Sequence, residues 1–351
     1  MRVLQVDSGR DWRGGQHQVW LLCRELDREA GIEQALVTKQ GGALAERAAA
    51  AGTKVHGTAW GIGLDPRAWW HLRRTIAAFQ PDVIHVHDSH ALTLAATVAQ
   101  RGGRGEGHRL VATRRVAFHT GRFGAWRRPD RIIAISDAVK RVLIADGIAS
   151  DAVVVVPDGI DVAAVRQAAT ALPPLDTRRR LGIPAAAPLV VNAAALTGEK
   201  DHGTLIRAAH CARARRPDLH WVIAGEGRLR DSLTAEIARL GLRDRVHLLG
   251  YVDRIDALIA EASVFVLSST TEGLGSVVLN ALALGRPVVA TAAGGIPEIL
   301  PAEVLVPVGA AEAMAQRIVE MLEHPMPLPL PPRFAASAMA QGVLDVYRSL
   351  V

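Results

Sequence analysis

Short apolar runs alternate with longer amphipathic stretches along the first half of the chain. Strands are predicted at residues 1–7, 34–38, 82–87, 110–113, 131–135 and 153–156, with one more beginning at Val55. Helices are predicted at residues 16–30, 42–51 and 66–79. In the third helix Trp69, Leu72, Ile76 and Phe79 recur at the spacing of a core-facing side. This alternation predicts a parallel sheet with helices on both faces.

The same alternation starts again after a proline-bearing stretch, residues 161–187, which we interpret as a linker with one short helix. Strands are then predicted at residues 189–193, 220–224, 246–249 and 263–267, and helices at residues 201–214, 228–240 and 255–260. A second proline-rich stretch, residues 325–332, precedes a helix at residues 334–350. We therefore expect an α/β protein with two domains, residues 1–165 and residues 186–325.

The carboxyl ends of the predicted strands are the expected ligand-binding positions, because open parallel sheets bind ligands there. In the first domain these positions are residues 7–15, 87–90, 114–118 and Ser136. Residues 8–15 are predicted to form a loop that ends in Gly14 and Gly15. A plain turn is the alternative for these two glycines.

One stretch shows how such a ligand could be held. It comprises residues 267–298, LSSTTEGLGSVVLNALALGRPVVATAAGGIPE. A polar loop leads through Glu272-Gly273-Leu274-Gly275 to a short helix that is predicted to begin at Ser276, a good N-cap residue, and to end at Gly285. A strand at residues 287–291 follows, and residues 294–298 are predicted to open another helix. Backbone N–H groups at a helix N-terminus receive phosphate. Glu272 precedes this terminus and Asn280 lies about one turn into the helix.

This stretch resembles the signature of the retaining glycosyltransferases of family 4 (glycosyltransferase group 1), which have the GT-B fold. The family pattern has a Glu-Gly-x-Gly loop, two glutamates separated by seven residues, a G-x-P-V-V-A-T strand and a G-G-x-x-E turn. Glu272 matches the first glutamate and Asn280 stands in place of the second. The resemblance implies two Rossmann-like domains facing a cleft. It also implies that residues 333–351 form a helix crossing back to the N-terminal domain.

The resemblance also assigns roles to residues. Glu272 is expected to orient the transferred sugar, Lys200 to bind the diphosphate as a second catalytic residue, and Asn280 to bind the ribose. The other residues expected at the nucleotide are Gly14, Gly15, Gly225, Glu226, Gly273, Leu274 and Gly275. The alternatives are a solvated Lys200, a surface Glu272 and an ordinary polar helix residue at Asn280.

The chain departs from the family pattern at three places. Ala194 and Ala195 stand where the family usually has a Gly-Arg pair, so one expected positive charge is missing. The amide of Asn280 replaces a carboxylate, although it still accepts a hydrogen bond from a hydroxyl. Arg114 and Arg115 follow Thr113 where family members often carry a histidine.

The composition narrows the choice of partners. The chain has 351 residues, 49% hydrophobic and 22% charged, with a formal charge of +6 and a pI of about 10.0. A basic balance suits phosphate-bearing partners. Aromatic residues make up only 4% and do not form a stacking platform, which disfavours nucleic acid. We expect no required cofactor, and a UDP- or GDP-linked sugar as substrate.

The location is expected to be cytoplasmic. The first residues, MRVLQVDSG, indicate a strand and not a signal peptide, and no apolar run reaches the ~20 residues that span a bilayer. Cys23 and Cys211 have no metal or redox spacing, which favours reduced thiols. His85, His87 and His90 lack the carboxylate or cysteine partners of a zinc site, so no metal is expected. His87 and Asp88 are instead interpreted as cleft-lining residues.

An arginine-rich stretch in the first domain suggests a membrane contact. Residues 101–131 contain nine arginines, two acids (Glu106 and Asp130) and the aromatic residues Phe118, Phe123 and Trp126. A run of charge is usually a solvated face. The mixture of arginine with apolar groups would also suit the inner face of an anionic membrane.

Together these features predict a hexosyltransferase. The expected acceptor is a glycan or lipid-linked molecule of cell-envelope polysaccharide or lipopolysaccharide synthesis. Two alternatives remain open. One is a nucleotide-sugar epimerase of the same fold. The other is a catalytically decayed binding protein, which Ala195 and Asn280 make plausible.

Overall fold

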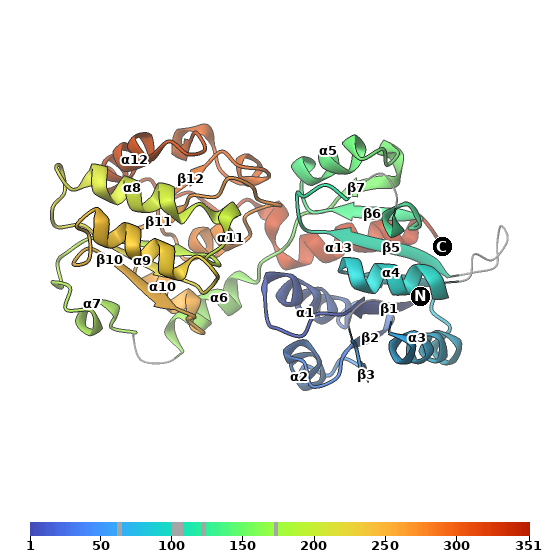
Figure 1. Cartoon of the computed structure of the whole chain (residues 1–351). Coiled ribbons are helices and arrows are strands. Elements are labelled where there is room, and N and C mark those ends of the chain that lie inside the picture. The colour runs from blue at the N-terminus through green and yellow to red at the C-terminus, as the bar shows by residue number, and fades with distance from the viewer. Residues whose placement is uncertain (62–64, 100–107, 121–123, 172–174) are drawn as a thin grey trace. The chain divides into compact units, whose positions relative to one another are not determined.

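The computed structural model describes residues 1–61, 65–99, 108–120, 124–171 and 175–351. They form two compact units (Figure 1). The N-terminal unit comprises Met1–Gly159 and Pro332–Val351, and the C-terminal unit comprises Ile160–Pro331.

The N-terminal unit contains a seven-stranded sheet in the order β3-β2-β1-β4-β5-β6-β7, with every pair parallel. Its strands are β1 (Arg2–Asp7), β2 (Glu33–Lys39), β3 (Val55–Thr58), β4 (Val83–Val86), β5 (Arg109–Arg114), β6 (Arg131–Ala134) and β7 (Val153–Val155). Its α-helices are α1 (Gly14–Leu26), α2 (Ala43–Ala50), α3 (Pro66–Phe79), α4 (Ser89–Val98), α5 (Asp137–Ala145) and α13 (Ala336–Arg348). Most strand residues are buried, as expected for a parallel sheet covered on both faces.

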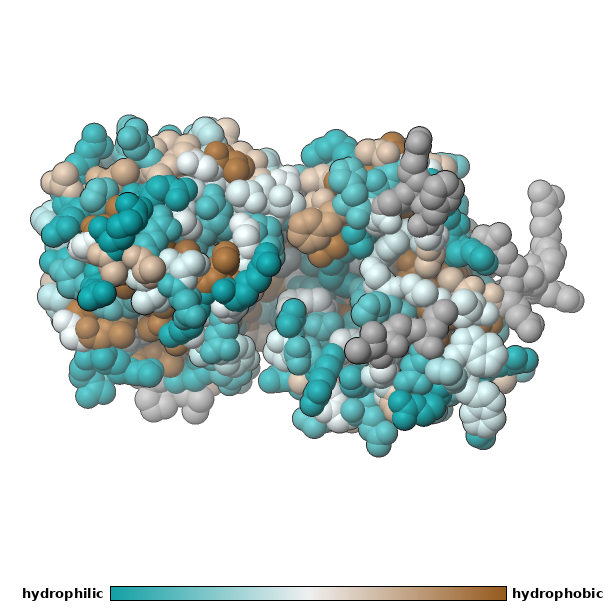
Figure 2. Space-filling view, viewed as in Figure 1, coloured by the Kyte–Doolittle hydropathy of each residue, from teal (hydrophilic) through white to brown (hydrophobic). Residues whose placement is uncertain are grey.

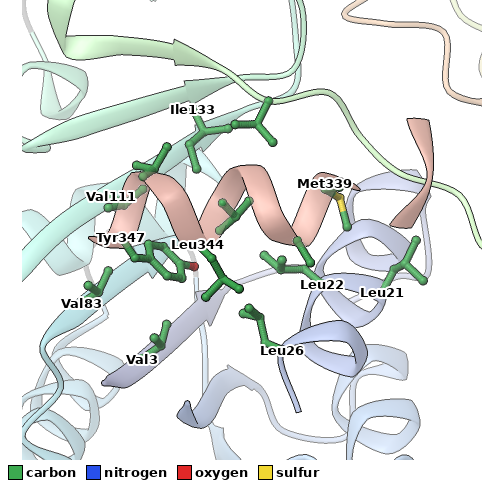
Figure 3. Packing of buried hydrophobic residues seen from close by; sticks show 14 of the residues in the cluster. Val3, Leu21, Leu22, Leu26, Val83, Val111, Ile133, Met339, Leu344 and Tyr347 are labelled. Carbon is green, nitrogen blue, oxygen red and sulfur yellow. The ribbon is translucent and has the colours of Figure 1, made fainter. Parts of the chain in front are cut away.

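The C-terminal helix α13 belongs to the core of this first unit (Figure 3). Its apolar side packs with α1 and with residues of the sheet. The cluster includes Leu21, Leu22 and Leu26 of α1, Met339, Leu344 and Tyr347 of α13, and Val3, Val83 and Val111. Burying a large apolar side chain stabilises a fold by roughly 1.5–3 kcal/mol. The return of the last helix to the N-terminal domain, predicted above, is therefore confirmed.

The C-terminal unit contains a six-stranded parallel sheet in the order β10-β9-β8-β11-β12-β13. Its strands are β8 (Leu189–Ala193), β9 (His220–Ala224), β10 (Val246–Gly250), β11 (Val264–Leu267), β12 (Val288–Thr291) and β13 (Leu305–Val306). Its α-helices are α6 (Val162–Thr170), α7 (Thr177–Arg180), α8 (His202–Ala212), α9 (Arg230–Arg239), α10 (Ile255–Ala260), α11 (Val277–Ala283) and α12 (Ala311–Glu323).

Several local predictions are wrong in detail. Gly14 and Gly15 form the first turn of α1 and do not end a loop. The described residues between 161 and 187 form two helices instead of one, and the first starts where Asp161 accepts a hydrogen bond from the Ala164 N–H. The helix predicted at residues 294–298 is a single 3-10 turn, Ile296–Glu298. Trp69 is only half-buried, and its indole N–H donates to Thr97 Oγ1 at 3.1 Å.

Hydrophilic residues cover most of the visible face of each unit, with hydrophobic residues in small groups between them (Figure 2). Large exposed apolar side chains include Trp70, which is 57% exposed, and Phe118, which is 51% exposed. Within the described part of the chain, no helix combines the length and the apolar character needed to pass through a bilayer.

Candidate donor site in the C-terminal unit

The loops that follow neighbouring strands of the C-terminal sheet are joined by backbone hydrogen bonds. They follow β8 (residues 194–201), β9 (225–229), β11 (268–276) and β12 (292–298). The bonds run from Leu196 N–H to Glu226 O at 2.9 Å, from Thr270 N–H to Glu199 O at 2.9 Å and from Gly295 N–H to Glu272 O at 3.3 Å. The carboxyl edge of this sheet is therefore one connected surface.

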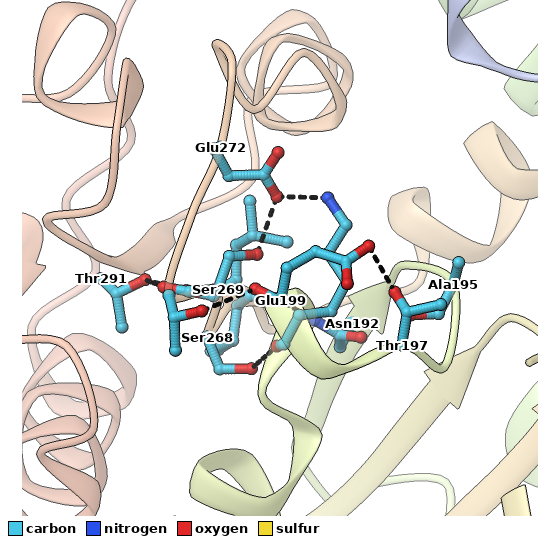
Figure 4. Close-up of polar contacts among 12 residues, drawn as sticks. Asn192, Ala195, Thr197, Glu199, Ser268, Ser269, Glu272 and Thr291 are labelled. Atoms are coloured by element: carbon cyan, nitrogen blue, oxygen red, sulfur yellow. Dashed lines mark hydrogen bonds and ion pairs between the residues drawn. The ribbon is translucent and has the colours of Figure 1, made fainter. Parts of the chain in front are cut away.

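Lys200 and Glu272, the two predicted catalytic residues, meet on this surface (Figure 4). Lys200 Nζ lies 2.6 Å from Glu272 Oε1, although the residues are 72 positions apart in the chain. The Lys200 side chain is 22% exposed and that of Glu272 is 10% exposed. A pair so poorly exposed is more strongly coupled than one in water. Either group is able to exchange its partner for a ligand, the ammonium for a phosphate oxygen and the carboxylate for sugar hydroxyls.

Hydroxyl side chains hold the two loops that carry this pair. Ser269 Oγ donates to Glu272 Oε1 at 2.7 Å, and Thr291 Oγ1 donates to the Ser269 carbonyl at 2.6 Å. Ser268 Oγ donates to the Lys200 carbonyl at 2.9 Å. These contacts were not predicted from the sequence. Their only signal there is the run of hydroxyl residues 268–271, which was interpreted as an unspecific polar loop.

Two glycines allow backbone segments to approach at this site. Gly294 has φ +53°, and a Cβ placed there would overlap the carbonyl oxygen of Glu272 and lie 2.8 Å from its carbonyl carbon. Gly225 has φ +148°, and a Cβ there would overlap the Ala194 carbonyl oxygen. Gly294, the first glycine of the Gly294-Gly295 pair, thus packs directly on the backbone of Glu272.

Asn280 contacts a carboxylate that no sequence motif indicates. Its Nδ2 donates to Asp256 Oδ1 at 2.7 Å. Burial raises the pKa of Asp256, and the hydrogen bond from Asn280 offsets part of that rise. Asp256 lies in the first turn of α10, and no local pattern connects it with a residue 24 positions later.

Other predicted nucleotide-binding residues lie on the same surface. Leu274 is 1% exposed, so its side chain belongs to the core and only its backbone is left for the predicted contact with the nucleotide. Gly275 has a left-handed backbone conformation, with φ +82°, and lies close to the Ile296 side chain. Glu226 is exposed and accepts a hydrogen bond from the Tyr251 N–H at 3.5 Å. The roles of these residues, and of Gly273, stay predictions.

Near Lys200, Glu199 and His202 have distinct environments. Burial pushes the pKa of Glu199 up, but the hydrogen bond from Thr197 and the charges of Lys200 and Arg228 bring it below its ordinary value. Burial and the charge of Lys200 lower the pKa of His202 to about 4, so the ring is neutral near pH 7. Neither ring nitrogen of His202 has a partner among the described residues.

Gly14 and Gly15 belong to the N-terminal unit. A Cβ at either would meet nothing within 4 Å, so packing inside this unit does not require glycine there. Their predicted approach to the donor diphosphate stays a prediction.

His85 and His87 are part of a buried hydrogen-bond network in the N-terminal unit. His85 Nδ1 lies 2.6 Å from Tyr347 Oη of α13. Gln5 Nε2 donates to the same hydroxyl at 3.3 Å. The other amide atom, Gln5 Oε1, accepts a hydrogen bond from His87 Nε2 at 2.8 Å. The unprotonated Nδ1 of His87 then faces Arg115 Nη1 at 3.5 Å. Burial lowers the pKa of both histidines well below its ordinary value. His87 is 5% exposed, so its ring contributes to the core.

Asp88, the second residue interpreted as lining a cleft, caps α4. It accepts hydrogen bonds from the backbone N–H groups of Ser8, His90 and Ala91. No group of three histidine, cysteine or acidic side chains able to hold a metal occurs among the residues that the structure describes.

In the arginine-rich stretch, several arginines serve internal contacts. Arg114 donates to the carbonyls of Val116 and Phe118 and lies 4.9 Å from the ring centre of Trp126. Arg115 pairs with Asp158 at 3.2 Å. Trp126 is only 9% exposed, so its inclusion in a membrane-facing surface is wrong: its ring is covered by the fold. Arg101, Arg104, Arg122 and Phe123 lie outside the described residues.

Comparison with known proteins identifies the family. The chain matches the model of Glycosyltransferase Family 4 over residues 12–164 and that of Glycosyl transferases group 1 over residues 175–339. It is 34% identical over 149 residues to the lipopolysaccharide core biosynthesis glycosyltransferase LpsE of Rhizobium meliloti. The matched segment covers 41% of this chain and 42% of that protein. It is 33% identical over 185 residues to the GDP-mannose-dependent monoacylated alpha-(1-6)-phosphatidylinositol monomannoside mannosyltransferase of Corynebacterium glutamicum, covering 48% of this chain and 47% of that one. The matched segments span less than half of each relative.

Solved structures show the same architecture along the whole chain. Anabaena HepE, crystallised in complex with UDP, has a TM-score of 0.81 at 21% identity and covers 99% of this chain and 100% of that one. UDP-GlcNAc 2-epimerase from Neisseria meningitidis, bound to UDP-GlcNAc, has a TM-score of 0.66 at 15% identity. The match covers 99% of this chain and 100% of the epimerase chain. The fold is GT-B, as predicted. The chain belongs to the group 1 glycosyltransferases, family 4.

Proposed function

We propose that this chain is a retaining hexosyltransferase. It transfers a hexose from a UDP- or GDP-sugar to a glycan or lipid-linked acceptor in cell-envelope polysaccharide or lipopolysaccharide synthesis. The observation that carries the proposal is the Lys200–Glu272 pair, whose charged atoms lie 2.6 Å apart on loops of one parallel sheet.

The two groups have complementary tasks in this reaction. Negative charge grows on the diphosphate oxygen as its bond to the sugar breaks, and preorganised charge and N–H groups stabilise it. Lys200 supplies the positive charge, and the segment 273–276 supplies backbone N–H groups. Glu272 accepts hydrogen bonds from sugar hydroxyls and fixes the orientation of the ring. The nucleotide sugar is a substrate, and the proposal requires no cofactor.

The named functions of the relatives support the proposed acceptor class. LpsE is named for lipopolysaccharide core synthesis and the Corynebacterium enzyme for a phosphatidylinositol mannoside. The UDP held by HepE supports a nucleotide donor. A cytoplasmic location with peripheral contact at the inner face of the membrane is part of the same proposal.

A thermal-shift panel of nucleotide sugars tests donor binding. A ligand at a hundred times its Kd stabilises the folded state by about 2.7 kcal/mol. For a unit of this size the melting temperature is expected to rise by about 5–10 °C with the correct UDP- or GDP-sugar. Lys200→Met should reduce the shift strongly. A panel without any shift would contradict an active donor site.

Product analysis then separates the alternatives. An epimerase would convert the free nucleotide sugar to its epimer without an acceptor, which the likeness to the Neisseria enzyme keeps open. A decayed glycosyltransferase would bind the nucleotide and produce neither product. Transfer of the hexose to an acceptor with release of the nucleoside diphosphate is the outcome that the proposal requires.

The membrane contact has its own test, flotation with liposomes that contain anionic phospholipid. Phe118, 51% exposed, is the described aromatic residue of the arginine-rich stretch that a bilayer could reach. Phe118→Ser combined with Arg101→Ser and Arg104→Ser is expected to reduce recovery several-fold, because both apolar and charge contributions are lost. Trp70→Ser, on the exposed side of α3, is the matched control. Equal recovery of the triple variant and wild type would count against the contact.

A further inference from the structure

The hydrogen bond between Asn280 and Asp256 joins two helices that both start at the ligand-binding edge of the C-terminal sheet. Asp256 is the second residue of α10, which follows β10, and Asn280 is the fourth residue of α11, which follows β11. Asn280 Nδ2 donates to Asp256 Oδ1 at 2.7 Å. Since strands of a parallel sheet end at the same edge, Asp256 is placed beside the position from which the family glutamate would act.

The geometry gives each member of the pair a distinct capacity. The amide of Asn280 uses a donor in this bond, and its own oxygen is a neutral acceptor. Asp256 is half-buried, and its carboxylate has two oxygens, only one of which takes part in the bond to Asn280. The other oxygen has no partner among the described residues. A carboxylate accepts hydroxyl donors more strongly than an amide does.

We propose that Asp256 supplies the carboxylate that accepts the ribose hydroxyls of the donor nucleotide, and that Asn280 positions it. The inference rests on the proposed function, because it assumes a nucleoside diphosphate at this edge. It explains how the chain keeps an acidic ribose contact although the expected glutamate is an amide. The acid has moved from α11 to the neighbouring helix α10, and Asn280 acts through it. Burial raises the pKa of this carboxyl, in keeping with a site shielded from water.

Calorimetric titration with UDP and GDP and with their 2′,3′-dideoxy analogues tests the proposal. Wild type is expected to bind the ribose form about tenfold or more tightly than the dideoxy form, because hydrogen bonds to a charged acceptor are lost in the analogue. Asp256→Asn is expected to weaken the ribose form about tenfold and to leave the dideoxy form unchanged. The difference between the two ligands cancels any general effect of the substitution on the fold.

Two further variants sharpen the result. Asp253→Asn removes an exposed carboxylate three positions earlier and is expected to leave the ribose preference unchanged. The double variant Asp256→Asn, Asn280→Glu returns the carboxylate to α11 and is expected to restore much of the preference. A merely structural link between the helices would not produce this restoration.

The outcomes separate this proposal from the proposed function. A wild type that binds neither nucleotide overturns both. A wild type that binds UDP or GDP without preferring ribose overturns the Asp256 role alone, whatever the variants do. Equal weakening of both ligands in Asp256→Asn, or no weakening, also overturns it and leaves the transferase proposal intact.

Discussion

Replacing Glu272 by glutamine is expected to lower kcat for sugar transfer by about 10²–10³-fold, the loss typical of removing one preorganised polar contact to the reacting group. The amide keeps the shape of the side chain but removes its negative charge. In wild type the Glu272 carboxylate lies 2.6 Å from the Lys200 ammonium and accepts a hydrogen bond from the Ser269 hydroxyl. Single-turnover release of nucleoside diphosphate, with the donor chosen by the thermal-shift panel, measures the change without the complication of product release.

The contact between the two side chains also predicts how their substitutions combine. Lys200→Met is expected to cost a similar factor, because it removes charge from the leaving diphosphate and leaves Glu272 poorly exposed without its partner. The double variant should be less impaired than the product of the two factors, since residues that act as a unit are not additive. Glu303→Gln, at an exposed position of the same unit, is the charge control. Activity of Glu272→Gln within about threefold of wild type would be incompatible with the assigned role.

Much of the fold could be predicted because parallel strands buried on both faces form continuous apolar runs. The helix Pro66–Phe79 has the predicted bounds, since Asp65 caps it and Pro66 occupies its first turn. Gly14 and Gly15 show the opposite case. Glycine favours loops on average, yet here the first turn of a helix accommodates both residues. The prolines of residues 161–187 similarly concealed two helices.

The candidate site was predictable where a local motif defines it and not where distant segments meet. Glu272 and Lys200 could each be located by their motifs, whereas their pairing across 72 residues depends on the order of β8 and β11 in the sheet. Asp256 carries no motif at all. Its importance follows from the hydrogen bond to Asn280, which only the packing of α10 against α11 creates. The departures from the family pattern are therefore where the structure adds most.

Gly294→Ala is expected to destabilise the C-terminal unit by about 4 kcal/mol or more, which is exceptional for one methyl group. Two causes add. Gly294 has φ +53°, a left-handed conformation that costs other residues about 1–2 kcal/mol. The new Cβ would also overlap the Glu272 carbonyl oxygen and lie 3.0 Å from the Glu272 nitrogen, and backbone cannot move aside as a flexible side chain can.

Gly285→Ala separates these two causes. Gly285 lies in the same unit with φ +66°, but a Cβ there meets nothing within 4 Å. Its substitution is expected to cost only about 1–2 kcal/mol, the conformational part alone. Native-state hydrogen exchange of the amides in β11 and β12 measures the local unfolding free energy of each variant. Equal losses in the two variants would show that contact with Glu272 contributes nothing. A much larger loss at Gly294, together with a lower kcat in whatever fraction stays folded, would show that this glycine holds the backbone of Glu272 in place.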